Sequence, residues 1–311
     1  MDDYPRTLLD LERRFSSDKA CHDYLGTLRW PNGFLCPGCG SREAWAMKGG
    51  LWLCRGCRRQ VSVTAGTIFH RTRLPLTVWF RAIWYVTSQK NGASAMTVQR
   101  VLGLGSYRTA WTWLHKLRRA MVRPGRDRLR GELEVDESFV GGEESGYEGR
   151  GAQTKALVVI AAEQNGRGTG RIRMARIPDA SKRYLHGFIQ QAVEPGSVVH
   201  TDGWASYGGL DAMGYGHRVT RLKGQPPSAA VAAMPRVHRV ASLLKRWLLG
   251  THQGAVSPNH LDYYLDEFTF RFNRRTSASR GKLFYRLLQQ ATQIGPTPYR
   301  EIIRPQPVGV G

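Results

Sequence analysis

The sequence is short of acidic residues. Its 311 residues include 24 Asp or Glu against 46 Lys or Arg, which gives a formal net charge of +22 at pH 7. So large an excess of positive charge makes a polyanion the expected partner, and nucleic acid is the commonest one. An anionic membrane surface is the competing interpretation.

A long apolar run is also missing. No stretch has the length of a membrane-spanning helix, and the charged N-terminal residues are not followed by the apolar segment of a signal peptide. We therefore expect a cytoplasmic protein that does not enter a membrane. Hydrophobic residues make up 41% of the chain, enough for packed domains, and 311 residues are too many for one average core.

Cysteine is scarce, with five residues, four of which fall within residues 36–57. An odd, clustered set argues against a secreted disulfide framework. The four form the motifs CPGC and CRGC with fourteen residues between them, which is the spacing of a tetrahedral Zn²⁺ site. A redox Cys pair or unligated thiols are the alternatives. The predicted zinc ligands are Cys36, Cys39, Cys54 and Cys57.

Between the two motifs, AWAMKGGLWLC is typical of two strands joined by a Gly-Gly turn, which predicts a zinc ribbon. Four thiolates leave no open coordination position, so the metal would be structural. A domain this small needs such a metal in order to fold. We expect Cys21, which has no matching partner nearby, to be an ordinary packed residue.

Residues 58–130 carry fifteen Lys or Arg and one acid, Asp127. A solvated surface normally mixes both signs of charge, so this region is expected to bind an anion. Three helices are predicted, and the last two, joined by GLGS, have the outline of a helix-turn-helix. A plain helical linker domain is the alternative. The candidate DNA-binding residues on the last helix are Arg108, Thr112 and Lys116.

Two acidic residues stand where strands of the second half end. ELEVDESFVGG alternates along its length and stops at two glycines, and SVVHTDG leads from an apolar strand to Asp202. Asp136 and Asp202 are carboxylates on a stiff scaffold, as a divalent metal site requires. The alternative is that each Asp merely caps a strand or a helix.

The order of elements predicts how these two strands are placed. Three strands in meander, followed by alternating helices and strands, is the order of a ribonuclease H-like domain, in which the first and fourth strands are neighbours. Asp136 and Asp202 would then meet and could bind two metal ions. The expected strands are 133–140, 155–163, 170–177, 197–202 and 217–220. The expected helices are 180–192, 204–212, 235–249, 258–273 and 281–291.

The third site residue is expected on the helix PRVHRVASLLKRWLLG, which contains no acid. Its polar candidates are His238 and Ser242, and Lys245 follows His238 by seven residues, or about two helical turns. Glu267 is the next acid that could reach the site. Its alternative role is as a solvated partner of Arg271, four residues later on the same helix.

With these motifs in view, the chain resembles the insertion-sequence transposases that join a zinc ribbon to a DDE-type ribonuclease H-like domain. The matching stretches include CPGC with CRGC, TAGTIFHRTRLPLTVWF, EVDESFVGG, VVHTDGWASY and HRVASLLKRWLLG. The resemblance implies that Asp136 and Asp202 are the first two members of the catalytic triad. In this family the third is usually Glu followed seven residues later by Lys or Arg, and here His238 and Lys245 have that spacing.

Such a site would bind Mg²⁺ or Mn²⁺, with Asp136 bridging two metals and Asp202 holding one. His238 would ligate the other metal or orient water or a phosphate. A nitrogen ligand suits Mn²⁺ better than Mg²⁺. Lys245 would contact a phosphate near the scissile bond, and Arg246 is a further candidate DNA contact.

The sequence thus predicts a mixed α/β, or α+β, fold and a transposase that acts on double-stranded DNA. We expect a homo-oligomer on the element ends. The alternatives are an inactive DNA-binding regulator and a ribonuclease H-like nuclease that does not join strands. The predicted parts are a helical segment (1–30), a zinc ribbon (31–66), a helix-turn-helix region (67–123), a linker (124–131), the catalytic domain (132–292) and a tail (293–311).

Overall fold

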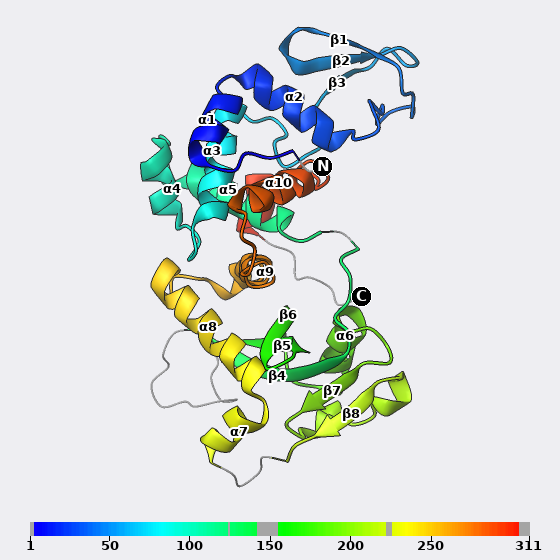
Figure 1. Cartoon of the computed structure of the whole chain (residues 1–311), viewed down its shortest axis with the longest axis vertical. Coiled ribbons are helices and arrows are strands. Elements are labelled where there is room, and N and C mark those ends of the chain that lie inside the picture. The colour runs from blue at the N-terminus through cyan, green and yellow to red at the C-terminus, as the bar shows by residue number, and fades with distance from the viewer. Residues whose placement is uncertain (1–2, 124, 142–154, 222–225, 305–311) are drawn as a thin grey trace. The chain divides into compact units, whose positions relative to one another are not determined.

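The computed structural model describes residues 3–123, 125–141, 155–221 and 226–304 (Figure 1). The first residue of the predicted linker, 124, and the end of the predicted tail, 305–311, lie outside them. The chain forms two compact units: Met1–Arg123 with Thr276–Ile303, and Pro124–Arg275 with Arg304–Gly311. No helix within the described ranges is long and apolar enough to cross a membrane.

The first unit begins with two helices and a small sheet. Ser17 caps the second helix, because its side chain accepts the Ala20 N–H. The sheet is three-stranded and antiparallel, so the predicted strand–turn–strand is confirmed. The elements are α1 (Leu8–Arg14), α2 (Asp18–Arg29), β1 (Ala44–Ala46), η1 (Lys48–Gly50), β2 (Leu51–Cys54) and β3 (Gln60–Ser62).

The three predicted helices follow: α3 (Leu76–Ser88), α4 (Ala95–Leu102) and α5 (Tyr107–Ala120). Gly103 ends α4 in the left-handed conformation, with φ of +62°, which glycine adopts without a steric penalty. Ser106 then begins α5, since its side chain accepts the Thr109 N–H. Gly103 and Ser106 therefore determine where the short connection between α4 and α5 begins and ends.

Two C-terminal helices, α10 (Arg280–Ala291) and α11 (Tyr299–Ile303), also belong to the first unit. Phe284 of α10 is fully buried, and its ring lies 5.6 Å from that of Phe80 and 5.7 Å from that of Trp84 on α3. The first unit thus includes a helix that the predicted catalytic domain, 132–292, had placed with the second.

The second unit contains a five-stranded sheet in the order β6-β5-β4-β7-β8. β4 pairs antiparallel with β5 and parallel with β7, as the predicted ribonuclease H-like order requires. The mixed α/β fold class is therefore confirmed. The strands are β4 (Glu132–Val140), β5 (Ala156–Asn165), β6 (Gly168–Ile177), β7 (Val198–Thr201) and β8 (Gly216–Val219).

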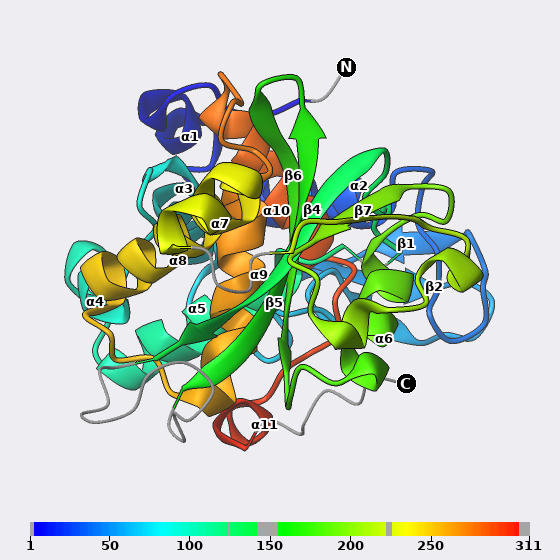
Figure 2. The same cartoon turned by 90° about the horizontal axis from the view of Figure 1, so that it is seen from below.

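Helices cover both faces of this sheet (Figure 2). Leu133 of β4 faces α6 in one core, while Val158 and Ile160 of β5 face α8 and α9 in the other. The period-2 alternation of each strand thus separates its residues between two cores. The helices and turn on these faces are α6 (Lys182–Ala192), α8 (Pro235–His252), η5 (Pro258–His260) and α9 (Leu261–Phe272).

Two segments differ from the expected elements. The predicted helix 204–212 is a pair of 3-10 turns, η3 (Ala205–Tyr207) and η4 (Asp211–Met213). Gly209 between them has φ of +94°, which is incompatible with a continuous right-handed helix. A short helix, α7 (Pro227–Ala233), precedes α8 and was not predicted.

The predicted linker is anchored to the second unit by Leu129. This side chain is fully buried, and the residue forms a parallel bridge with Val193. Its N–H donates to the carbonyl of Ala192 at 2.8 Å, and its own carbonyl accepts the N–H of Glu194 at 2.8 Å. The described residues of this segment therefore extend the ribonuclease H-like fold before β4 begins.

Candidate functional site

The four predicted zinc ligands come together at the ribbon. The Sγ atoms of Cys36 and Cys57 lie 3.7 Å apart, and those of Cys39 and Cys54 lie 3.5 Å apart. All four lie within 4.8 Å of one another. Within the described ranges, this is the one group of three or more His, Cys, Asp or Glu side chains that is close enough to hold a metal ion. Four convergent thiols fit tetrahedral Zn²⁺.

Backbone amides lower the pKa of two of these thiols. The Gly38 N–H lies 3.4 Å from Sγ of Cys36 and lowers the pKa of that thiol. Backbone hydrogen bonding, first from Cys57, lowers the pKa of Cys54 to about 6. Burial instead raises the pKa of Cys21 to about 12, so this fifth cysteine stays a protonated packing residue.

The two predicted catalytic carboxylates lie on neighbouring parallel strands. β4 and β7 pair with Glu134 opposite His200. Two residues further along, the same register brings Asp136 level with Asp202, at the edge where β7 ends. The sequence-based prediction that these strands are neighbours is confirmed.

Backbone amides of neighbouring residues bind both carboxylates. Oδ1 of Asp202 accepts the Trp204 N–H at 2.9 Å, while Oδ1 of Asp136 accepts the Glu137 N–H at 2.9 Å. Gly203 turns the chain directly after Asp202 with φ of +85°, where a Cβ would also lie 3.0 Å from the Val219 side chain. A glycine is therefore needed beside the second carboxylate.

His238 on α8 joins this pair, with Nε2 lying 3.9 Å from Oδ2 of Asp136. That nitrogen is buried and has no hydrogen-bond partner in the described part of the chain. Burial lowers the pKa of His238 despite the nearby charges of Glu134 and Asp202, and Lys245 lowers it further. A neutral imidazole with an unpartnered nitrogen fits a metal ligand.

The predicted DNA-contacting residues lie along α5. Arg108 is exposed, whereas Thr112 and Lys116 are partly buried. Leu114 and Leu117 on the same helix are buried. Of the three predicted residues only Arg108 is exposed, and contact of α5 with DNA stays a prediction.

Comparison with known proteins adds the family. A model described as the ISXO2-like transposase domain matches residues 128–273, and one described as the transposase zinc-ribbon domain matches residues 16–60. The chain belongs to the insertion-sequence transposases. The zinc ribbon and the DDE-type domain that the sequence resembled are therefore both present.

Among relatives of this transposase is an uncharacterized protein in the transposable element ISH50 of Halobacterium salinarum. It is 28% identical over 282 residues, covering 83% of this chain and 92% of the relative. The simian T-cell lymphotropic virus intasome, solved in complex with PP2A regulatory subunit B56 gamma, has 13% identity and a TM-score of 0.32. That alignment covers 74% of this chain and 76% of that chain, and a TM-score so low says nothing further about the transposase.

Glu134 is a residue near the transposase site that the sequence-based reasoning did not assign. Its Oε2 accepts the backbone N–H groups of Arg236 and Val237 at 2.6 and 3.0 Å, and its Oε1 lies 2.7 Å from Nη1 of Arg236. Glu134 therefore anchors the first turn of α8 through Arg236 and Val237, the two residues directly before His238. Its place two residues before Asp136 on an alternating strand was the available signal.

Glu137 points to the opposite face of β4. Its Oε2 accepts the hydroxyl hydrogen of Tyr207 at 2.8 Å, and Tyr207 is fully buried. Burial and the charges of Glu137, Asp136 and Asp202 together raise the pKa of Tyr207 well above its ordinary value. The tyrosine hence stays protonated and can hold Glu137 behind the carboxylate pair.

Other candidate residues on the helices have different environments. Lys245 and Arg246 are both exposed on α8, and desolvation followed by the charge of Lys155 lowers the pKa of Lys245. Glu267 is fully buried, and its Oε1 lies 2.7 Å from Nη2 of Arg271. The predicted pairing with Arg271 is confirmed, but the prediction that the pair is solvated is wrong, because α9 turns it into the core.

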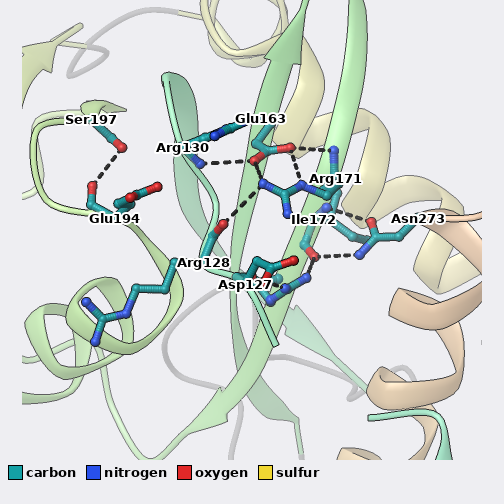
Figure 3. A network of polar contacts seen from close by, with 10 residues as sticks. Asp127, Arg128, Arg130, Glu163, Arg171, Ile172, Glu194, Ser197 and Asn273 are labelled. Atoms are coloured by element: carbon teal, nitrogen blue, oxygen red, sulfur yellow. Dashed lines mark hydrogen bonds and ion pairs between the residues drawn. The ribbon is translucent and has the colours of Figure 1, made fainter. Parts of the chain in front are cut away.

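A polar network links strands β5 and β6 to the segment before β4 (Figure 3). The Arg171 guanidinium donates to Glu163 at 2.6 Å and to the carbonyl of Arg128 at 3.1 Å. Burial would raise the pKa of Glu163, but hydrogen bonds from Arg171 and from the Arg130 amide hold it below its ordinary value. The charged pair thus ties residues before β4 to the β5–β6 hairpin.

Proposed function

We propose that this transposase binds the terminal inverted repeats of its insertion sequence and catalyses metal-dependent DNA cleavage and strand transfer. One observation carries the proposal: the register of β4 with β7 brings Asp136 level with Asp202, and a buried, unpartnered imidazole nitrogen of His238 on α8 lies 3.9 Å from Asp136. The membership of the chain in a transposase family supports the same reaction class.

Asp136 and Asp202 would hold Mg²⁺ or Mn²⁺, since hard cations prefer carboxylate oxygen. When bound, such ions polarise the attacking hydroxyl and stabilise the leaving oxygen in phosphodiester chemistry. His238 would ligate the cation or orient water, and an imidazole favours Mn²⁺ over Mg²⁺. Lys245, two helical turns along α8, would contact a phosphate of the substrate.

DNA binding would use the first unit and the exposed side of α8. We propose that α5 contacts the element ends through Arg108, Thr112 and Lys116, and that Arg246 contacts DNA near the catalytic edge. The supporting observation is the charge of residues 58–130, which carry fifteen Lys or Arg and one acid. Structural Zn²⁺ would hold the ribbon folded.

A single reaction tests the proposal. Purified chain is mixed with labelled duplexes that carry the ends of its element, a target plasmid, and Mg²⁺ or Mn²⁺. Joined, branched products are expected with the wild-type chain and not with Asp136→Asn. Cleavage without joining would identify a ribonuclease H-like nuclease instead, because only strand transfer makes branched DNA.

The departure at His238 favours one alternative, a DNA-binding regulator without activity. A regulator would bind the ends but neither cleave nor join them with either cation. We further propose that the transposase assembles as a homo-oligomer on its ends and acts in the cytoplasm, where clustered thiols stay reduced. Light scattering of the DNA complex tests the assembly.

A further inference from the structure

A basic pocket of about 550 Å³ lies beside α5 within the first unit. Loop residues 71–74, the start of α5 and Tyr299 of α11 contribute to it, and no Asp or Glu lines it. Its lining includes four cationic side chains: Arg71, Arg73, Arg108 and Lys116.

The loop that carries two of these cations is fixed in place. Nε1–H of Trp79 donates to Oγ1 of Thr72 at 2.8 Å, and the Thr72 hydroxyl donates to the carbonyl of Leu74 at 3.2 Å. Trp79 is buried and stacks on Trp113 of α5, with ring centroids 3.7 Å apart. Arg71 adopts φ of +54°, a conformation rare for residues with a side chain. The loop is therefore held against the same helix that supplies the other cations.

None of the four cations forms an ion pair with a carboxylate of the described residues. Arg108 instead lies over the ring of Tyr299, 4.1 Å from its centroid. Partial burial lowers the pKa of Lys116, because the ammonium group loses part of its hydration. A cluster of like charges repels itself, and a bound anion would relieve that repulsion.

We propose that this pocket binds a backbone phosphate of duplex DNA through Arg71, Arg73, Arg108 and Lys116, with Tyr299 positioning the Arg108 guanidinium. The inference rests on the proposed binding of element ends and assigns these cations to the backbone rather than to base edges. Guanidinium groups match phosphate oxygens in bidentate geometry. A phosphate contact sets the register of a protein on DNA and carries no sequence information.

The test compares two duplexes of equal length, one carrying an element end and one scrambled. Arg71→Gln and Arg73→Gln change exposed loop residues, and Arg100→Gln, an exposed residue of α4 that does not line the pocket, is the control. Each pocket variant should bind both duplexes roughly tenfold more weakly. Each should also lower the slope of log affinity against log salt by about 1. Arg100→Gln should change neither quantity as much.

Tyr299 is tested separately by a double-mutant cycle. Tyr299→Ala should weaken binding by roughly two- to fivefold, because the ring no longer holds the guanidinium. In the Arg108→Gln background the same substitution should have no further effect. Unchanged melting temperatures would show that each variant is folded.

Three outcomes would overturn the pocket. These are unchanged affinity and salt slope in both loop variants, an equal loss in Arg100→Gln, and a loss confined to the element-end duplex. The last would mean that the cations contact bases. If the wild-type chain binds both duplexes equally, the proposed recognition of element ends is wrong. The pocket is still supported in that case if Arg71→Gln and Arg73→Gln lose affinity equally for both duplexes. A chain that binds neither duplex rejects both proposals.

Discussion

Nε2 of His238 lies 3.9 Å from Oδ2 of Asp136, and this contact joins α8 to the strand at the centre of the sheet. The same strand carries Glu134, which holds the first turn of α8 by its backbone amides. One strand therefore supplies both a predicted metal ligand and the anchor of the helix that brings the next one. The site depends on the packing of α8 as much as on its own carboxylates.

Replacing Asp136 or Asp202 by Asn should abolish cleavage and leave binding of element ends nearly unchanged. Each amide keeps the side-chain size but removes a charge that a divalent cation requires, so activity should fall by orders of magnitude. Gel assays of cleavage and of binding measure the two effects. Asp262→Asn, which loses a partly exposed pair with Arg176, is the matched control and should stay active.

A fully active Asp202→Asn chain would contradict the DDE-type mechanism. If binding were lost together with cleavage, the substitution would instead have disturbed the fold, and circular dichroism would detect that change. Asp202 is a sensitive position for this test, because its Oδ1 also fixes the turn at Trp204. An Asn side chain keeps an oxygen acceptor for that backbone amide.

His238→Ala should lose cleavage, and His238→Glu should retain part of it in Mg²⁺. A carboxylate at this position supplies the oxygen that Mg²⁺ prefers, whereas alanine supplies no ligand. The ratio of activity in Mn²⁺ to activity in Mg²⁺ should therefore fall in the Glu variant relative to wild type. Cleavage assays over a range of both cations give that ratio. A fully active His238→Ala chain would remove His238 from the site.

Loss of His238 from the site would not by itself promote Glu267. The sequence offered this acid as the next candidate, and its pairing with Arg271 four residues later was readable from helical spacing. Its burial was not, because that depends on which face of α9 packs against the sheet. In the structure the carboxylate is fully buried and bound to Arg271.

The strand order of the second unit was predictable because the alternation along each strand and the order of elements both indicated it. The placement of α10 was not, since an amphipathic helix can pack on any apolar surface, and Phe284 packs on α3. The predicted helix 204–212 failed at Gly208 and Gly209, where two adjacent glycines divide it into short turns. Local sequence patterns thus predict where helices and strands form better than they predict which surfaces those elements pack against.

The site was predictable to the same extent. Asp202 was found because it follows an apolar strand and precedes a glycine, and Asp136 because it lies on an alternating strand that stops at two glycines. The structure places Asp136 in the middle of β4 rather than at its end, and the register of β4 with β7 brings the two residues level. Glu134 was missed because an acid on an alternating strand normally faces solvent. Glu134 can be buried because its carboxylate accepts the amides of Arg236 and Val237. These residues lie about a hundred positions later in the chain, so no local sequence pattern predicts the contact.

Cys54→Ser should lose bound zinc, while Cys21→Ala should retain it. Cys54 supplies one of four convergent thiols, whereas Cys21 is a buried packing residue outside that group. Elemental analysis should give one zinc per wild-type chain, and chelation should unfold the ribbon. Full zinc content in Cys54→Ser would show that the four-thiol site is wrong.

Glu134→Ala should destabilise the second unit far more than Glu132→Ala on the same strand. Glu134 is 3% exposed, and its loss would leave Arg236 and two helix amides without their acceptor, at a cost of roughly 3–5 kcal/mol. Glu132 lies 3.6 Å from Arg218 in a pair whose side chains are 49% and 51% exposed, and such pairs contribute about 0–1 kcal/mol. Urea unfolding of the full chain measures both free energies. Equal, small losses would mean that α8 is anchored by its apolar contacts alone. A large loss in Glu134→Ala with reduced cleavage in Glu134→Gln would instead make the carboxylate the positioning group for His238.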